Sequence, residues 1–231
     1  MKSIFHPANS RGDVNHGWLH AKHSFSFGSW YNPERVHFGA LRVLNDDIVA
    51  AGMGFGTHPH DNMEIITIPL SGVIAHKDSM GNASTINAGE IQVMSAGTGI
   101  QHSEFNPINE ELNLFQIWIF PDKKQVEPRY AQRPFEIGQN EFTLLVGPEI
   151  TGLSTWIHQD AYLSMGNFDA DFSYQLKQEG NGIYLMVVEG EVEIENQVLQ
   201  AKDAMGISQA EIIHIQSKLP SKILVIEVPM N

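Results

Sequence analysis

Short segments rich in β-branched and aromatic residues, separated by turns that contain glycine, recur along this chain at roughly even spacing. The clearest of them are residues 64–69, 91–95 and 112–120. No stretch has a convincing amphipathic helical period. Short strands with glycine-rich turns are typical of an antiparallel sandwich or barrel. The sequence therefore predicts an all-β fold with few short helices.

Further strands in the first half are predicted at residues 23–30, 73–76 and 84–87. The first of these alternates Phe with small polar residues, which is the period of a half-buried strand. Residues 41–44 and 48–51 are predicted to pair as a hairpin, because the Asn45-Asp46-Asp47 sequence between them is typical of a turn.

A polar stretch that contains three prolines, residues 121–134, interrupts this pattern. The domain boundary is predicted there or just after it, so that residues 1–135 form an N-terminal domain and residues 136–231 a C-terminal domain. Two pattern segments of the first half, residues 70–76 and 86–96, recur in diverged form at residues 188–194 and 199–210. This similarity indicates an internal duplication.

The composition excludes several kinds of site and partner. The chain has 231 residues, 42% of them hydrophobic, which is enough for one large domain or two small ones with buried cores. It has no cysteine, so disulfides, thiolate metal sites and a cysteine nucleophile are excluded. Its 27 acidic and 14 basic residues give a formal charge of −13. This charge disfavours direct binding to nucleic acid or to an anionic membrane.

The chain has no apolar run of signal-peptide length and no run of eighteen apolar residues, so we expect a cytoplasmic protein without a membrane segment. Two barrels can pack against each other within one chain, which is compatible with a monomer. The sequence is also compatible with a protein partner.

Two spaced pairs of candidate ligands lie between residues 52 and 106: His58 with His60, and His102 with Glu104. Because strand side chains alternate, each pair projects from one face of its strand. Three imidazoles and one carboxylate suit a first-row divalent metal, whereas Mg or Ca sites are richer in oxygen. The four residues therefore predict a metal site with positions open to a substrate oxygen or dioxygen. A closed structural zinc site is the alternative, but such sites usually contain cysteine.

His58 and His60 lie fourteen and twelve residues before the turn glycine Gly72. The residues at the same distances before Gly190 are Leu176 and Gln178. The second repeat thus lacks the paired histidines. Its late histidine, His214, has no partner in the pattern and is interpreted as structural. One repeat is predicted to carry chemistry and the other to be scaffold.

Other titratable residues have alternative interpretations. Glu64 is the rival carboxylate, and it is a ligand, a partner that orients an imidazole, or a buried acid satisfied by hydrogen bonds. His76 and Asp78 are predicted to lie outside the barrel. The histidines near the amino terminus are expected to cap and pack rather than coordinate, and the aromatic segment beside them is a candidate cover for the pocket mouth. They are His16, His20 and His23.

At these residues the chain resembles a cupin, and specifically the pirin family. The first cupin signature is matched by Gly52, His58, His60 and Glu64, with Gly72 one residue late. The second signature is matched by Gly99, His102 and Asn106, with Gly97 where proline is usual and a longer gap from Gly89. The most pirin-like stretches are residues 23–33 and 95–106, and the resemblance covers nearly the whole chain.

The resemblance implies two tandem cupin domains that face each other, with a metal only in the first. It assigns Glu104 to the metal and Glu64 to a position behind the ligands. The implied metal is Fe(II), with Mn, Ni, Cu, Co or Zn as alternatives. The implied activity is that of a quercetinase, which opens the heterocyclic ring of a flavonol such as quercetin with dioxygen and releases carbon monoxide. Glu104 would take the proton of the flavonol 3-hydroxyl as general base.

Two other functions stay open at this point. Pirin relatives are also described as metal-binding regulators that bind other proteins. A cupin oxygenase with a different physiological substrate is the third alternative. Substrate choice depends on the shape of the pocket, which the ligand pattern does not contain.

Overall fold

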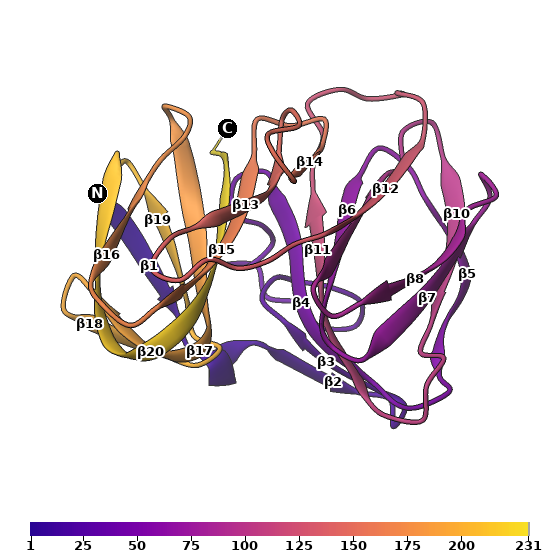
Figure 1. Cartoon of the computed structure of the whole chain (residues 1–231), viewed down its shortest axis with the longest axis horizontal. Helices are drawn as coiled ribbons and strands as arrows, with labels where there is room; N and C mark the ends of the chain where they lie inside the picture. Colours follow the sequence, from indigo (N-terminus) through magenta and orange to yellow (C-terminus); the bar gives the residue numbers. More distant parts are fainter. Residues whose placement is uncertain (231) are drawn as a thin grey trace.

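The computed structural model describes residues 1–230, and these residues are almost entirely in β-strands. The only helical element in that range is the 3₁₀ helix η1 (Ala8–Ser10). Two β-lobes lie side by side (Figure 1), which confirms the prediction of an all-β chain with two barrels facing each other. Asn231, the last residue of the predicted C-terminal domain, lies outside the described residues. Within residues 1–230, no helix has the length and apolar character needed to cross a membrane.

The N-terminal lobe consists of a four-stranded and a seven-stranded antiparallel sheet. The smaller sheet has the order β5 (Gly54–His60), β10 (Ile100–Phe105), β7 (Val73–Asp78) and β8 (Ala83–Asn87). The larger has the order β12 (Arg129–Pro134), β9 (Glu90–Ser95), β6 (Glu64–Ser71), β11 (Leu112–Ile119), β4 (Leu41–Val49), β3 (Leu19–His23) and β2 (Gly12–Asn15). Side chains of the two sheets meet in the barrel interior.

The C-terminal lobe contains a nine-stranded sheet. Its main order is β1 (Lys2–His6), β19 (Ala204–Ser208), β17 (Asn181–Ile194), β20 (Ile212–Pro229), β15 (Tyr162–Phe168), β13 (Thr143–Gly147) and β14 (Thr155–Trp156). Two further strands branch from it, β16 (Phe172–Gln175) on β20 and β18 (Gln197–Gln200) on β17. The amino-terminal strand β1 thus belongs to the sheet of the far lobe, as its indigo ribbon shows (Figure 1). The domain boundary after residue 135 stays a prediction.

The large sheet of the N-terminal lobe has two chemically different faces. On β11, Phe115 and Ile117 contribute to an apolar cluster shared with the other lobe, whereas Gln116 between them lines the interior of the N-terminal barrel. The same alternation holds on β6, where Ile66 joins the shared cluster and Thr67 contacts Glu104 inside the barrel. Period-two alternation therefore places Gln116 and Thr67 in the barrel and their apolar neighbours in the seam. Apolar residues such as Leu114 and Ile65 share the inner face with them.

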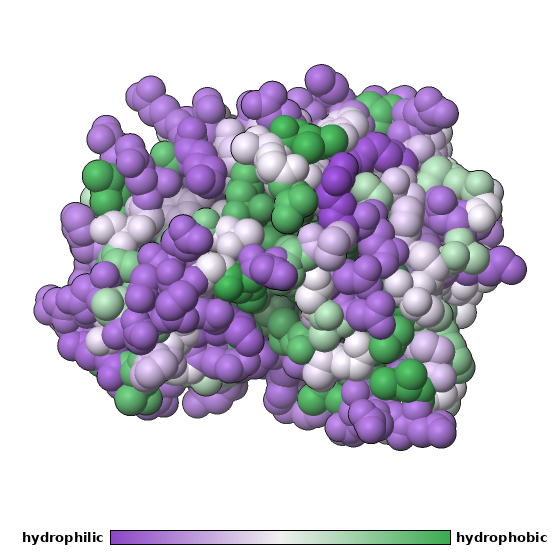
Figure 2. Space-filling model, viewed as in Figure 1, coloured by the Kyte–Doolittle hydropathy of each residue, from purple (hydrophilic) through white to green (hydrophobic). Residues whose placement is uncertain are grey.

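The two lobes are joined by that apolar cluster, which we call the seam. Its buried members come from both lobes, including Leu44 and Ile68 from the N-terminal lobe and Tyr184, Leu224 and Ile226 from the C-terminal lobe. Apolar groups are also visible at the surface along the junction of the lobes (Figure 2). Burial of these side chains is the main favourable term that holds the two lobes together.

The structure corrects the hairpin predicted at Asn45-Asp46-Asp47. Residues 41–49 form one continuous strand, β4, in which Asn45 and Asp47 line the N-terminal barrel. Asp46 points the other way and accepts from Arg11 at 3.4 Å and Lys202 at 3.1 Å. These partners lie far away in the sequence, so long-range pairing overrides the turn propensity of the three residues.

Two other predictions about strands are wrong. β3 ends at His23, and residues 24–30 contain only an isolated bridge between Phe27 and Trp30. The proline-containing stretch in which no strand was predicted ends in β12, which pairs with β9 at the edge of the large sheet. An edge position tolerates proline because one side of the strand needs no ladder hydrogen bond.

Candidate metal centre

Two neighbouring strands bring the four predicted ligands to one end of the N-terminal barrel. β10 pairs with β5 so that His102 lies opposite His58. Beyond this pair the register shifts by one residue, and Glu104 lies opposite Phe55 rather than Gly56. A bulge of this kind reorients a side chain. Phe55 therefore faces the same cavity as His58 and Glu104.

The three imidazoles form a compact triangle. The ring centroids of His58 and His102 are 4.4 Å apart, and the ring of His60 is 4.8 Å from each of the other two. The Nε2 atoms of His60 and His102 approach to 3.0 Å. Three nitrogens that converge in this way are a fitting donor set for one divalent transition metal.

The protonation of these rings also fits a metal site. Burial, reinforced by the neighbouring His58, lowers the pKa of His60 to about 4 and that of His102 to about 3. Both rings are therefore neutral at pH 7 and have a free lone pair. His58 Nδ1 donates to the carbonyl oxygen of Gly56 at 2.8 Å, which leaves its Nε2 as the lone-pair nitrogen.

Glu104 is a buried acid whose hydrogen bonds come only from neutral groups. Gln116 Nε2 donates to its Oε2 at 3.1 Å, and Thr67 Oγ1 lies 3.4 Å from its Oε1. Burial raises the pKa of Glu104 to about 7, although these two hydrogen bonds act in the opposite sense. Within residues 1–230 it has no salt bridge. A buried carboxylate without a cationic partner is costly, and a bound divalent ion would supply the missing charge.

Glu104 is grouped differently from the two histidines of β5. A carboxylate oxygen of Glu104, a ring nitrogen of His102 and one of His76 lie within 4.8 Å of one another. His58 and His60 form their own group of the same size with His102. His102 is thus the member common to both groups, and Glu104 lines the same cavity as His58 and His60.

The cavity above these residues has a volume of about 220 Å³. Aromatic side chains surround it, with the Trp118 ring 4.9 Å from that of His60 and the Phe27 ring 5.2 Å from that of Trp118. Phe27 belongs to the aromatic segment that the sequence predicts near the pocket mouth. The lining residues are Phe27, Asn45, Asp47, Phe55, His58, His60, Glu104, Gln116 and Trp118.

Several of these lining residues were not predicted from the sequence. Gln116 lines the cavity and Thr67 contacts Glu104, and both are polar residues inside the apolar runs L-N-L-F-Q-I-W-I-F and E-I-I-T-I-P. A polar residue at an inward strand position is the signal that could have identified them. Asp47 also lines the cavity, and its Oδ1 is buried without a hydrogen-bond partner. Burial, followed by the neighbouring Asp46 and Glu104, raises the pKa of Asp47 to about 8.

The resemblance implies that Glu64 lies behind the ligands, but the structure places it elsewhere. It shares the seam face of β6 with Ile66, and its Oε2 accepts from Ser95 Oγ at 2.6 Å. Burial raises the pKa of Glu64 to about 7, while Ser95 and Arg129 act in the opposite sense. Of the three interpretations, the buried acid satisfied by hydrogen bonds agrees with these contacts.

His76 and Asp78 are inside the barrel, so the prediction that they lie outside is wrong. They follow Ile74 on the inward face of β7, and their side chains are fully buried. His76 pairs in register with Glu104, and Asp78 with His102. The alternation Ile74, His76, Asp78 is present in the sequence, but a polar barrel interior hides which face is inside.

The remaining histidines do not reach the cluster. His20 pairs with Asp13 at the surface, and His23 Nδ1 lies 2.8 Å from Oδ1 of Asn45. His214 is exposed and lies 3.3 Å from Ser173 Oγ. These contacts agree with the structural interpretation of His23 and His214.

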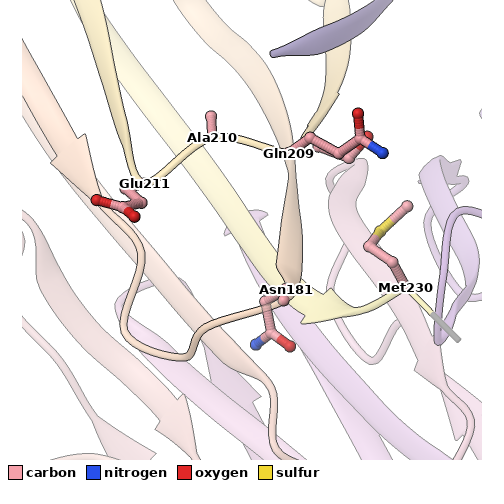
Figure 3. Close-up of a pocket in the computed structure, with 7 residues that line it drawn as sticks. Asn181, Gln209, Ala210, Glu211 and Met230 are labelled. Atoms are coloured by element: carbon pink, nitrogen blue, oxygen red, sulfur yellow. The ribbon is translucent and has the colours of Figure 1, made fainter.

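A larger pocket of about 560 Å³ lies at the end of the C-terminal barrel (Figure 3). Glu211 is the one ionisable side chain among its described lining residues, and Asn181 and Gln209 supply amides. In Figure 3, Glu211 and Gln209 point in different directions rather than toward a common point. This pocket therefore lacks the convergent donors found in the N-terminal barrel.

Comparisons with known proteins agree with this architecture. The Pirin family profile matches residues 5–119, and a profile described as the quercetinase C-terminal cupin domain matches residues 144–228. Quercetin 2,3-dioxygenase of Escherichia coli K12 is 43% identical over 225 residues, which are 96% of each chain.

Two solved structures from Escherichia coli share the whole fold. The crystal structure of YhhW superposes with a TM-score of 0.95 at 41% identity and covers 100% of this chain and 99% of the other. The structure of bacterial pirin YhhW in complex with nickel(II) has a TM-score of 0.94 at 40% identity and covers both chains completely. With close sequence identity along its full length and the same pair of barrels, this chain belongs to the pirin family.

Proposed function

We propose that this protein is a metal-dependent dioxygenase that opens the heterocyclic ring of flavonols such as quercetin. The observation that carries the proposal is the triangle of imidazoles at an aromatic-lined cavity that also contains the buried Glu104. The names of relatives such as quercetin 2,3-dioxygenase of Escherichia coli support the same reaction.

In this proposal His58, His60, His102 and Glu104 hold one divalent metal. When bound, the metal would act as a Lewis acid that raises the acidity of a coordinated hydroxyl and brings the substrate together with dioxygen. Fe(II) is our first expectation, with Mn, Ni, Cu, Co and Zn as alternatives. Among these, nickel(II) is the metal in the complex of the related pirin YhhW.

The protein's own residues have separate tasks. Glu104 accepts the proton of the flavonol 3-hydroxyl, and Gln116 and Thr67 hold its carboxylate in place. Trp118 and Phe27 contact the aromatic rings of the substrate and exclude water.

The experiment is a two-stage assay on protein reconstituted separately with Fe, Mn, Ni, Cu and Co. Anaerobic incubation with quercetin should shift the absorption of the flavonol, and admission of air should then release carbon monoxide. Glu104→Gln should still take up metal but should lose most of the turnover. Absence of carbon monoxide with every metal would contradict the quercetinase activity.

A second candidate is a cupin oxygenase that acts on a smaller aromatic substrate. The observation in its favour is the cavity volume of about 220 Å³, which is below the range of roughly 300–1,000 Å³ usual for drug-sized ligands. A one-ring aromatic substrate needs less volume than a three-ring flavonol. Dioxygen uptake with a one-ring ortho-hydroxylated substrate, at a higher kcat/KM than with quercetin, would favour this candidate.

A further inference from the structure

His102 has neighbours on both sides within its sheet. The strand order β5-β10-β7 puts His58 and His60 on one side of β10, and His76 and Asp78 on the other. The ring centroids of His76 and His102 are 5.3 Å apart. His76 thus lies beside the shared member of the ligand cluster, on the strand that carries no predicted ligand.

Asp78 determines which nitrogen of His76 carries a proton. Its Oδ1 accepts from the backbone N–H groups of Met80 and Asn82 at 3.0 Å each, and its Oδ2 accepts from Asn82 Nδ2 at 2.8 Å. The same Oδ2 lies 3.2 Å from His76 Nε2. A carboxylate held by so many donors is an acceptor. His76 Nε2 is therefore protonated, and its Nδ1 keeps a lone pair.

Two buried ring nitrogens remain without partners, Nδ1 of His76 and Nδ1 of His102. A buried polar atom without a partner is costly. The Nε2 of His102 is already committed to the metal cluster through its approach to His60. The structure contains no hydrogen bond between these two atoms. A hydrogen bond from His102 Nδ1–H to His76 Nδ1, formed when a metal orients the His102 ring, would satisfy both and leave His102 Nε2 the lone pair that a metal needs.

His58 provides the precedent within this molecule, because its tautomer is set directly by the Gly56 carbonyl oxygen. Metal-binding histidines generally need such a partner on the second nitrogen, and its loss weakens metal binding. His102 Nδ1, in contrast, has no hydrogen-bond partner among residues 1–230. His76 is the neighbouring side chain whose ring lies 5.3 Å from that of His102 and whose own Nδ1 is unpartnered, so it suits this role.

We propose that His76, held by Asp78, is a positioning residue that fixes the tautomer and ring orientation of His102 and thereby strengthens metal binding. The chain of contacts runs from Asp78 to His76 to His102. The inference rests on the proposed metal site but not on the flavonol reaction, so it is tested without a substrate.

The test compares His76→Phe with wild type and with His6→Phe. Phenylalanine keeps the ring and removes both nitrogens. His6 is the matched control, since it is also a buried histidine, with its Nδ1 2.9 Å from Tyr184 Oη, but it lies on β1 in the other lobe. Each purified protein is titrated with Co²⁺ against a competing chelator, its visible cobalt spectrum is recorded, and the metal-free form is melted.

We expect His76→Phe to bind Co²⁺ about 10–100-fold more weakly than wild type, with a cobalt spectrum of unchanged shape. His6→Phe should bind as wild type does, even if it melts earlier. Asp78→Asn is the second variant, because its Oδ1 can still accept from the turn amides. It should weaken binding by a smaller factor than His76→Phe, and it decides the question if His76→Phe does not fold.

Wild-type affinity in folded His76→Phe, or in Asp78→Asn when only that variant folds, would overturn the proposal. A cobalt spectrum that shows one ligand fewer would overturn it as well, because His76 would then itself be a ligand. If wild-type protein binds no Co²⁺, Ni²⁺ or Fe²⁺, the proposed metal site fails and this inference fails with it. Metal binding without flavonol turnover would contradict only the proposed reaction.

Discussion

The two barrels of this chain have related strand pairings but opposite interiors. In the N-terminal barrel, β10 pairs with β5 and buries His102 and Glu104. In the C-terminal barrel, the first part of β20 pairs with β16 and buries Ile213 and Ile215. Both faces of the C-terminal sheet are mainly apolar, because Ile183 and Leu185 of β17 fill the barrel while Tyr184 faces the seam. The buried Glu227 on β20 is an exception, and it accepts hydrogen bonds from Tyr174 Oη and Asn181 Nδ2.

The difference shows that this fold does not need a cluster of imidazoles in its barrel. Apolar side chains fill most of the C-terminal barrel, and buried polar groups are costly unless they are paired. The N-terminal barrel nevertheless keeps unpartnered buried atoms on Asp47, His76 and His102. In the C-terminal barrel the buried acid Glu227 has hydrogen-bond partners, although Ser164 Oγ has none. The unpartnered titratable groups of the N-terminal barrel therefore point to a role in chemistry.

The largest expected effect comes from removing two ligands at once. His58→Ala combined with His102→Ala should reduce bound metal to background and abolish flavonol turnover, while the C-terminal barrel stays intact. Free Ni²⁺ at a hundred times its Kd should raise the free energy of unfolding of wild type by about 2.7 kcal/mol. Chemical unfolding with and without Ni²⁺ checks this, and an equal Ni²⁺ effect on the double variant would contradict the assigned site.

The next effect concerns stability rather than chemistry. Ile215→Ala in the C-terminal barrel removes buried side-chain atoms from a filled core, and should lower the free energy of unfolding by about 2–5 kcal/mol. Metal stoichiometry, measured on folded protein, should not change. A fall in bound metal per folded chain would mean that the two barrels are not chemically separate.

A smaller effect is expected from pH. Burial, together with Arg35, lowers the pKa of His6 from its ordinary 6.5 to about 4. Because the unfolded state binds more protons between these values, the stability contributed by His6 is complete above about pH 6.5 and is lost as the pH falls toward 4. Urea unfolding at several pH values should show a shallower loss for His6→Gln than for wild type. The metal-site imidazoles are common to both proteins, so equal slopes would contradict this role of His6.

The smallest effect is expected at His214, the late histidine of the second repeat. It is exposed, so His214→Ala should change the free energy of unfolding by no more than about 0.5 kcal/mol and leave metal binding unchanged. Thermal melting with metal titration checks both. A loss of metal would show that the second barrel also contributes a ligand.

Local pattern predicted the strands of the first half well where glycine turns separate apolar runs, as at β6, β9 and β11. It also predicted correctly that His58, His60 and His102 lie together, because residues two apart point to the same side in any strand. It failed at Asn45-Asp46-Asp47, where the apparent turn is part of a strand. There Asp46 pairs with the distant Lys202, and Asn45 and Asp47 line a cavity formed with residues from distant segments.

The pair His76 and Asp78 was missed for a related reason. Alternation identifies the two faces of a strand, but hydrophobicity identifies the inner face only when the interior is apolar. In β7 the inner face carries one isoleucine followed by a histidine and an aspartate. Only the register with β10, which the sequence does not contain, shows that they lie behind His102.

The measurement that tests the central claim most directly is anomalous diffraction from crystals of the intact protein grown with Ni²⁺. Difference maps from data above and below the nickel absorption edge should contain one strong peak per chain, among His58, His60, His102 and Glu104. The C-terminal barrel should contain none. An absent peak at that cluster, or a second one of equal height in the C-terminal barrel, would contradict the division into one chemical barrel and one scaffold barrel.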